Sequence, residues 1–124
     1  MKPKLLLVDD SGLARRGMRA ILEPAGFDVV EAEDGMAALE RYFLDRPDIV
    51  MLDLVMKGMY GLDVLEKLRE IDPAARVIVV SADVQDSSQQ LVKSAGASGF
   101  ITKPVERERV LSVVREVLEK QVQP

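Results

Sequence analysis

Residues 49–53 read Ile-Val-Met-Leu-Asp, four consecutive apolar side chains followed by a carboxylate. A run of this kind is typical of a strand that is covered on both faces, as in a parallel sheet. Leu5 to Val8 shows the same pattern before two aspartates, and Val77 to Val80 shows it before a serine. With two less continuous runs included, strands are expected at Lys4 to Val8, Phe27 to Ala32, Ile49 to Leu52, Val77 to Val80 and Gly99 to Thr102.

The segments between these runs carry apolar residues at helical spacing. In the first segment, Leu13, Met18, Ile21 and Leu22 share one stripe, and in the second Asp34 is the expected N-cap. Helices are expected near residues 13–22, 36–43, 62–71, 87–95 and 106–121. Strand and helix therefore alternate five times, which predicts one α/β domain over residues 1–124, a doubly wound parallel sheet with helices on both faces. Residues 121–124 are expected to form a short tail.

The composition excludes several classes of function. The 124 residues include 17 Lys and Arg against 21 Asp and Glu, so the net charge of −4 leaves no basic stripe for nucleic acid. The chain has no Cys and no His, so thiol chemistry is excluded and any histidine chemistry has to come from a partner. The longest nearly apolar run, Ile49 to Met56, is too short for a membrane span. We therefore expect a soluble, cytoplasmic protein without membrane or nucleic-acid contacts.

Polar residues follow the strands at the edge where ligands bind in open α/β sheets. They are Asp9, Asp10, Asp53, Ser81 and Lys103. Three neighbouring carboxylates repel one another, and Lys103 with one divalent cation balances their charge. Oxygen ligands without His or Cys favour Mg²⁺. A metal beside Asp53, with the ammonium and hydroxyl groups opposite, suits phosphoryl transfer, so Asp53 is the candidate nucleophile that forms an acyl phosphate.

These residues, together with Gly61, Phe100 and the pair Lys103-Pro104, resemble the receiver domain of two-component response regulators, of the chemotaxis-regulator type. The resemblance spans essentially the whole chain. It implies a flavodoxin-like fold with five helices and a five-stranded parallel sheet in the order 2-1-3-4-5. It also implies that Asp10, Asp53 and the backbone carbonyl of Val55 coordinate Mg²⁺, while Asp9 acts through a bound water.

The resemblance implies a signalling role as well. Asp53 would accept a phosphoryl group from a phosphohistidine on a sensor histidine kinase or phosphotransfer protein, and Lys103, joined to Pro104 by a cis peptide bond, would bind a phosphoryl oxygen. Ser81 and Phe100 would act as the switch that changes the surface of the fourth helix, fifth strand and fifth helix. The downstream protein that reads this surface is not identified by the sequence.

Such a protein catalyses its own phosphorylation and dephosphorylation without being a conventional turnover enzyme. We expect a bacterial, cytoplasmic protein that is a monomer or weak dimer. Two residues in the loop after Asp53 depart from the family pattern: Lys57 stands where proline is usual, and Tyr60 where an acidic or amide residue is usual. Neither departure removes a ligand.

Other interpretations of these residues can be compared with the sequence, and two of them require residue types that it lacks at the relevant positions. Asp9 and Asp10 could cap the first helix. A nucleotide-binding P-loop would need Lys-Ser/Thr where Met18-Arg19 stand, and a haloacid-dehalogenase-like hydrolase would need a second Asp at Val55. A flavin phosphate would be repelled by the acidic strand ends. The strongest alternative is a receiver-like module that binds proteins without being phosphorylated.

Overall fold

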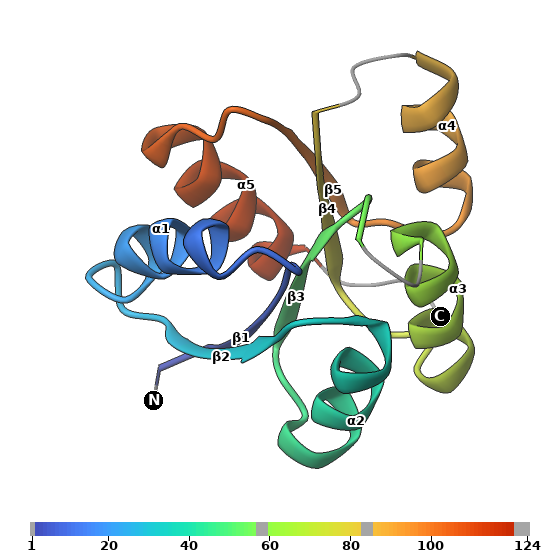
Figure 1. Ribbon diagram of the computed structural model, residues 1–124, viewed down its shortest axis with the longest axis horizontal. Coiled ribbons are helices and arrows are strands. Elements are labelled where there is room, and N and C mark those ends of the chain that lie inside the picture. The colour runs from blue at the N-terminus through green and yellow to red at the C-terminus, as the bar shows by residue number, and fades with distance from the viewer. Residues whose placement is uncertain (1, 57–59, 83–85, 121–124) are drawn as a thin grey trace.

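The computed structural model describes residues 2–56, 60–82 and 86–120, in which five strands alternate with five helices (Figure 1). The elements are β1 (Lys4–Val8), α1 (Gly12–Leu22), β2 (Asp28–Ala32), α2 (Gly35–Asp45), β3 (Ile49–Asp53), α3 (Gly61–Ile71), β4 (Val77–Ser81), α4 (Asp86–Ser94), β5 (Gly99–Thr102) and α5 (Arg107–Glu119).

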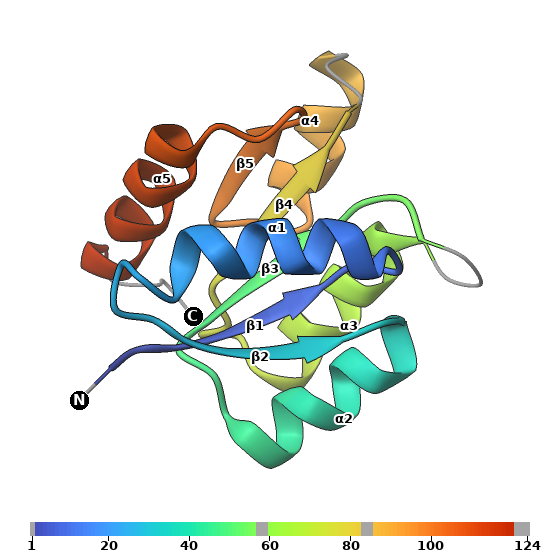
Figure 2. The ribbon, with the colours of Figure 1, turned by 60° about the vertical axis from the view of Figure 1, so that its left-hand side comes forward.

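The strands form one parallel sheet in the order β2-β1-β3-β4-β5, which confirms the predicted fold class and strand order. The register places Val8 between Ala32 of β2 and Leu52 of β3. The order therefore reverses at β1, and the residues that follow β1 and β3 lie at the same edge of the sheet (Figure 2).

Two layers of helices explain why the strands are continuously apolar. α1 and α5 cover one face of the sheet, and α2, α3 and α4 cover the other (Figures 1 and 2). Along β1, Leu5 and Leu7 enter the core under α1 and α5, whereas Leu6 and Val8 enter the opposite core. All five residues of β3 and of β4, and Leu5 to Val8 of β1, are thus buried, and alternation with polar residues is absent there.

Most of the helix ends described below lie at residues that commonly cap or terminate helices. Asp34 caps α2 as predicted, because its Oδ1 accepts a hydrogen bond from the backbone N–H of Ala37 at 2.8 Å. α1 is followed by Gly26, whose φ of 101° is a left-handed conformation that favours glycine. α5 begins at Arg107, after Glu106 as N-cap, and the expected end at Gln121 lies outside the described residues.

The prediction that Leu13 belongs to the buried stripe of the first helix is wrong. Leu13 is 77% exposed, whereas Met18 and Leu22 are buried. At about 100° per residue, Leu13 lies roughly 140° around the helix axis from Met18, so both cannot face the sheet. Leu13 instead lies in the first turn of α1, next to the edge that carries the aspartates.

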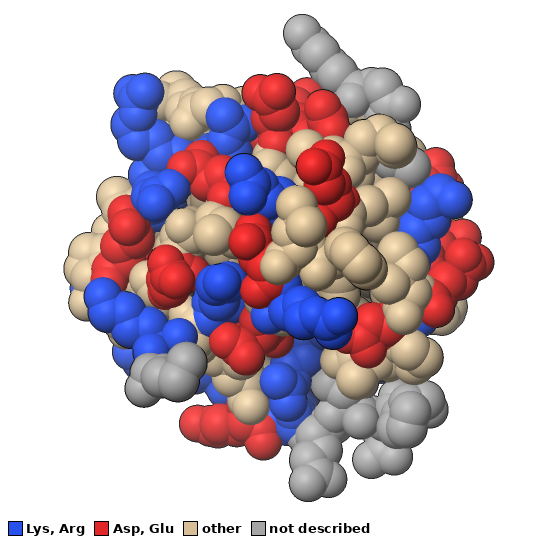
Figure 3. Space-filling view, turned by 90° about the horizontal axis from the view of Figure 1, so that it is seen from below, with Lys and Arg blue, Asp and Glu red and all other residues tan. Residues whose placement is uncertain are grey.

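The surface carries charges of both signs. The face shown in Figure 3 has acidic and basic side chains interspersed with one another rather than gathered into a stripe. Among the described residues, no helix has the length and apolar character needed to cross a bilayer. The expected tail, residues 121–124, lies outside the described part of the chain.

Candidate functional site

Three carboxylates meet at the edge where β1 and β3 end. Asp9, Asp10 and Asp53 each place one carboxylate oxygen within 4.8 Å of the others. Asp9 and Asp53 are 7% and 8% exposed, while Asp10 is exposed to solvent. The pairing of Val8 with Leu52 brings together residues that are 43 or more positions apart in the sequence. The structure thus places all three predicted carboxylates in one cluster.

Lys103 supplies the positive charge of this cluster. Its Nζ lies 3.4 Å from Oδ2 of Asp53 and 3.7 Å from Oδ2 of Asp9. The backbone N–H of Lys103 donates to the carbonyl of Ser81 at 2.9 Å, which joins the end of β5 to the end of β4. The peptide bond between Lys103 and Pro104 is cis.

Asp53 is a carboxylate in a setting that disfavours its charge. Burial is the main factor that raises its pKa, and the negative charge of Asp9 raises it further. The ammonium of Lys103 and the backbone N–H of Val55, both hydrogen-bonded to the carboxylate, act in the opposite direction without cancelling the shift. The site is therefore short of positive charge, and a bound cation would stabilise the ionised form of Asp53.

The backbone around Asp9 is held by several hydrogen bonds. Its N–H donates to the carbonyl of Ala32 at 3.2 Å, and its Oδ1 accepts from the N–H of Ser11 at 2.9 Å. Ser11 is the N-cap of α1, with its Oγ accepting from the N–H of Ala14 at 3.1 Å. The capping interpretation of the two aspartates is therefore wrong, because Ser11 performs that role.

The contact between Arg15 and the backbone of Asp9 was not predicted from the sequence. Its Nη1 donates to the backbone carbonyl of Asp9 at 2.7 Å, and its Nε pairs with Glu31 of β2 at 2.8 Å. At about 100° per residue, Arg15 lies roughly 20° from Leu22 around the axis of α1, so the sequence already places it on the sheet side of the helix. No spacing rule links it to Glu31, 16 positions away.

The start of α3, at Gly61, lies close to the backbone of the phosphoacceptor candidate. The N–H of Gly61 donates to the carbonyl of Leu54 at 2.7 Å, and a Cβ at Gly61 would lie 2.5 Å from the carbonyl oxygen of Asp53. Only glycine fits such a close approach. Val55 pairs with Tyr60 in an isolated bridge, and both are exposed. Lys57 lies outside the described residues.

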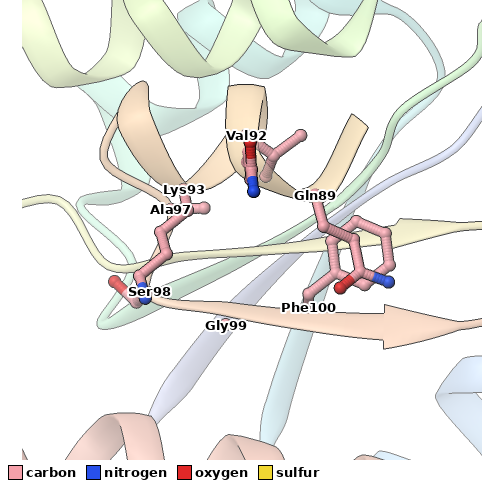
Figure 4. A pocket seen from close by; sticks show the side chains of 8 residues that line it. Gln89, Val92, Lys93, Ala97, Ser98, Gly99 and Phe100 are labelled. Atoms are coloured by element: carbon pink, nitrogen blue, oxygen red, sulfur yellow. The ribbon is translucent and has the colours of Figure 1, made fainter. Parts of the chain in front are cut away.

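The two proposed switch residues lie on neighbouring strands. Ser81 is the last residue of β4 and is buried, and Phe100 of β5 is half-buried. Phe100 lines a pocket of about 420 Å³ between β5 and α4, which Gln89 and Lys93 also line (Figure 4). This pocket opens on the α4 side of the sheet and is separate from the carboxylate cluster, whose adjoining cavity of about 280 Å³ lies beside α1.

The residues present fit a hard divalent cation. All three side chains offer carboxylate oxygen, and Mg²⁺ is held in proteins by one or two carboxylates together with water and phosphate oxygens. The exposure of Asp10 leaves the cluster open to solvent and to a partner. The adjoining cavity, with Asp9, Asp53 and Lys103 in its wall, gives further room beside the carboxylates.

Comparison with known proteins agrees with this arrangement. The chemotaxis protein CheY of Bacillus subtilis (strain 168) is 40% identical over 119 residues, which are 95% of this chain and 99% of the relative. CheY of Thermotoga maritima is 37% identical over 118 residues, covering 94% of this chain and 98% of the relative. A chain in the crystal structure of the CheX–CheY–BeF3–Mg²⁺ complex from Borrelia burgdorferi has a TM-score of 0.90 at 35% identity, covering 94% of this chain and 90% of that one.

The family assignment rests on the extent of these matches as well as on the site. Residues 5–115, from β1 into α5, match the response regulator receiver domain family. The CheY proteins are covered almost from end to end, so the likeness extends to the whole fold and not to one motif. The chain therefore belongs to the response regulator receiver domains of two-component and chemotaxis systems.

Proposed function

We propose that this receiver accepts a phosphoryl group on Asp53 in a Mg²⁺-dependent transfer from the phosphohistidine of a sensor histidine kinase or phosphotransfer protein. The observation that carries the proposal is the cluster of three carboxylates within 4.8 Å of one another, with the ammonium of Lys103 3.4 Å from Asp53. A buried carboxylate beside an ammonium and an open oxygen-ligand site is the combination that phosphoryl transfer to an aspartate requires.

Each residue has a distinct part in the transfer. A carboxylate oxygen of Asp53 attacks phosphorus as the phosphorus–nitrogen bond of the donor breaks, and the released imidazole nitrogen takes up a proton. Lys103 binds a phosphoryl oxygen. Asp10, Asp53 and the backbone carbonyl of Val55 would hold Mg²⁺, with Asp9 acting through a bound water. The metal supplies neutralisation of the phosphoryl charge when it is bound.

The solved relative supports this assignment of the site. The Borrelia burgdorferi CheY is named as a complex with CheX, BeF3 and Mg²⁺, at 35% identity to this chain. That protein therefore combines the CheY fold with the metal proposed here. The absence of His from this chain also agrees with a phosphohistidine supplied by a partner.

We place the output on the side of the sheet that carries α4. Ser81 lies at the end of β4 next to the site, and Phe100 lines the pocket between β5 and α4 (Figure 4). Rearrangement of this pair after phosphorylation would change the surface formed by α4, β5 and α5, which a downstream protein then reads. The complex of CheX with the Borrelia CheY is one example of a receiver bound to another protein.

Labelling by a small acyl phosphate tests the proposal. The wild-type chain should gain one phosphoryl group with acetyl phosphate and Mg²⁺, and lose the reaction with EDTA. Asp53→Asn should abolish labelling, whereas Asp28→Asn, which changes an exposed aspartate at the start of β2, should leave it intact.

Labelling of Asp53→Asn at the wild-type level would contradict the assignment. An unlabelled but folded wild-type chain would favour the alternative, a receiver-like module that binds proteins without phosphorylation.

A further inference from the structure

Arg15 connects three elements at the edge of the metal site. From α1, its Nε pairs with Oε1 of Glu31 in β2 at 2.8 Å, and its Nη1 donates to the carbonyl of Asp9, after β1, at 2.7 Å. The side chain of Arg15 is 18% exposed, so most of the guanidinium is withdrawn from solvent. In Figure 2, β1 and β2 run next to each other on one side of α1.

The carbonyl that Arg15 contacts belongs to the peptide group between two of the candidate metal ligands. Because a peptide group is planar, a hydrogen bond to the Asp9 oxygen also fixes the direction in which the chain continues to Asp10. β2 ends at Ala32, whose carbonyl accepts the N–H of Asp9. Arg15 provides a side-chain donor to the same residue at the point where the ladder between β1 and β2 ends.

Glu31 is itself held from a second side. Its Oε2 pairs with Nη1 of Arg19. The Nε of Arg19 pairs with Glu23 at 2.8 Å, and its Nη2 donates to the carbonyl of Val29 at 3.3 Å. The carboxylate of Glu31 therefore presents one oxygen to each arginine. This arrangement fixes the guanidinium of Arg15 through a network anchored on β2 and α1 and independent of any bound cation.

We propose that Arg15 is a positioning residue for the metal site, which holds the Asp9–Asp10 peptide in the orientation that binds Mg²⁺. The inference rests on the proposed function, because it requires that Mg²⁺ binds at this cluster. Partners of this kind, which orient ligands without touching the metal, typically change metal affinity by about 10- to 100-fold when they are removed.

Simple electrostatics predicts that removing Arg15 changes the Mg²⁺ affinity in the opposite direction, so the two explanations can be distinguished. Arg15 carries a positive charge close to the site, so removing that charge should strengthen the binding of a cation by Coulomb's law. A positioning role predicts weaker binding instead. Arg16 offers a matched control, since it is the neighbouring residue of α1, carries the same charge and is exposed.

Calorimetric titration with MgCl₂ of the metal-free full chain measures the affinity directly, and labelling activity is not needed. Arg15→Gln should bind Mg²⁺ about tenfold more weakly or worse, whereas Arg16→Gln should bind it as tightly as the wild type or more tightly. Glu31→Ala should also weaken binding. The double variant Arg15→Gln/Glu31→Ala should be no weaker than Arg15→Gln alone, because Glu31 acts through Arg15.

A second variant separates positioning from a loss of folding. Arg15→Lys keeps the charge, but its ammonium is a single point donor and cannot serve Glu31 and the Asp9 carbonyl with the fork of a guanidinium. Its Mg²⁺ affinity should fall between those of the wild type and Arg15→Gln, in a chain whose circular dichroism is unchanged.

Two results overturn the inference, and they are distinguishable. If the wild type binds Mg²⁺ and Arg15→Gln and Arg15→Lys bind it as tightly as Arg16→Gln, Arg15 has no positioning role and the proposed function stands. Should Arg15→Gln fail to fold, Arg15→Lys alone decides, and an unchanged affinity counts against the proposal. If the folded wild type binds no Mg²⁺, the proposed function fails together with the inference.

Discussion

Asp53 ends a strand whose five residues are all buried, and its carboxylate faces that of Asp9. A carboxyl group with a raised pKa binds its proton more tightly in the folded protein than in the unfolded chain. The contribution of Asp53 to the free energy of unfolding therefore favours the folded state at low pH. This contribution is lost as the pH rises through the pKa that Asp53 has in the folded protein. Above that pKa, without metal, the ionised Asp53 opposes folding.

The residue-scale prediction concerns stability against pH. In EDTA at neutral pH, Asp53→Asn should be more stable than the wild type, and the difference should shrink as the pH falls below the pKa of Asp53, where the wild-type carboxyl is neutral. Thermal unfolding at a series of pH values measures this difference. Asp28→Asn, at an exposed position, serves as the control. An Asn variant that is less stable at neutral pH, or a difference that does not depend on pH, would contradict the account.

A substitution of Lys103 can separate the binding of Mg²⁺ from the binding of the phosphoryl group. Its Nζ pairs with two carboxylates, so Lys103→Met removes a positive charge and keeps most of the side-chain stem. Mg²⁺ affinity should be unchanged or higher, because the cluster becomes more negative. In the wild type, labelling should change the protection of amides in α4 and β5 against hydrogen exchange. In Lys103→Met, labelling should change this protection less. A wild-type change in protection would refute this role for Lys103.

At the scale of elements, the glycine that begins α3 allows this helix to start close to the backbone of Asp53 and Leu54. A Cβ at Gly61 would lie within 2.8 Å of backbone atoms of Asp53 and Leu54, which cannot move aside as a flexible side chain can. Gly61→Ala should therefore cost about 1–3 kcal/mol of stability.

Gly17 provides the matched control for this substitution. It lies inside α1, and, apart from the adjoining residues and backbone of that helix, no atom of the described residues lies within 4 Å of the position a Cβ would take. Gly17→Ala should therefore stabilise the protein by about 0.5–1 kcal/mol, because alanine is the better helix former. Urea unfolding of both variants measures the two changes. A neutral Gly61→Ala would show that the start of α3 does not depend on the close approach.

The elements themselves could be predicted from the sequence, because parallel strands buried on both faces leave a continuous apolar signal. β1 and β5 have the predicted bounds, and β3 and β4 each extend one residue further, to Asp53 and Ser81. Leu13 was misplaced because its position around the helix axis, about 140° from Met18, turns it away from the sheet.

The site was predictable to the extent that topology determines it. Strand order alone brings residues 50 positions apart, Lys103 and Asp53, to one edge. The contact between Arg15 and the Asp9 carbonyl could not be predicted, since it depends on the rotamer of one long side chain and on Glu31 in another strand. Periodicity describes which face of a helix a residue occupies, not which backbone atom its side chain reaches.

At the scale of the whole molecule, the fold separates the carboxylate cluster, the proposed phosphorylation site, from the α4 side, the proposed output surface. The carboxylates lie where the strand order reverses at β1, and the pocket lined by Phe100 lies between β5 and α4. The hydrogen bond from the N–H of Lys103 to the carbonyl of Ser81 joins the ends of the two intervening strands. Under the proposed function, a change of charge at Asp53 would reach the α4 side through β4 and β5, the two strands that carry the proposed switch residues.

Metal binding should stabilise the whole fold, because the site exists only when β1 and β3 are paired. At Mg²⁺ concentrations about 100 times the dissociation constant, the gain should be about 2.7 kcal/mol. Thermal unfolding with and without MgCl₂ measures this gain. Asp10→Asn, which removes one oxygen ligand, should reduce the gain, and an equal gain in this variant would argue against Asp10 as a ligand.

The most direct test of the account is an NMR titration of the ¹⁵N-labelled metal-free chain with MgCl₂. The account predicts saturable shifts centred on the backbone amides of Asp10, Ser11 and Leu54, next to the three carboxylates. A dispersed spectrum of a folded protein in which these amides do not respond, or in which the saturable shifts lie elsewhere, would contradict it.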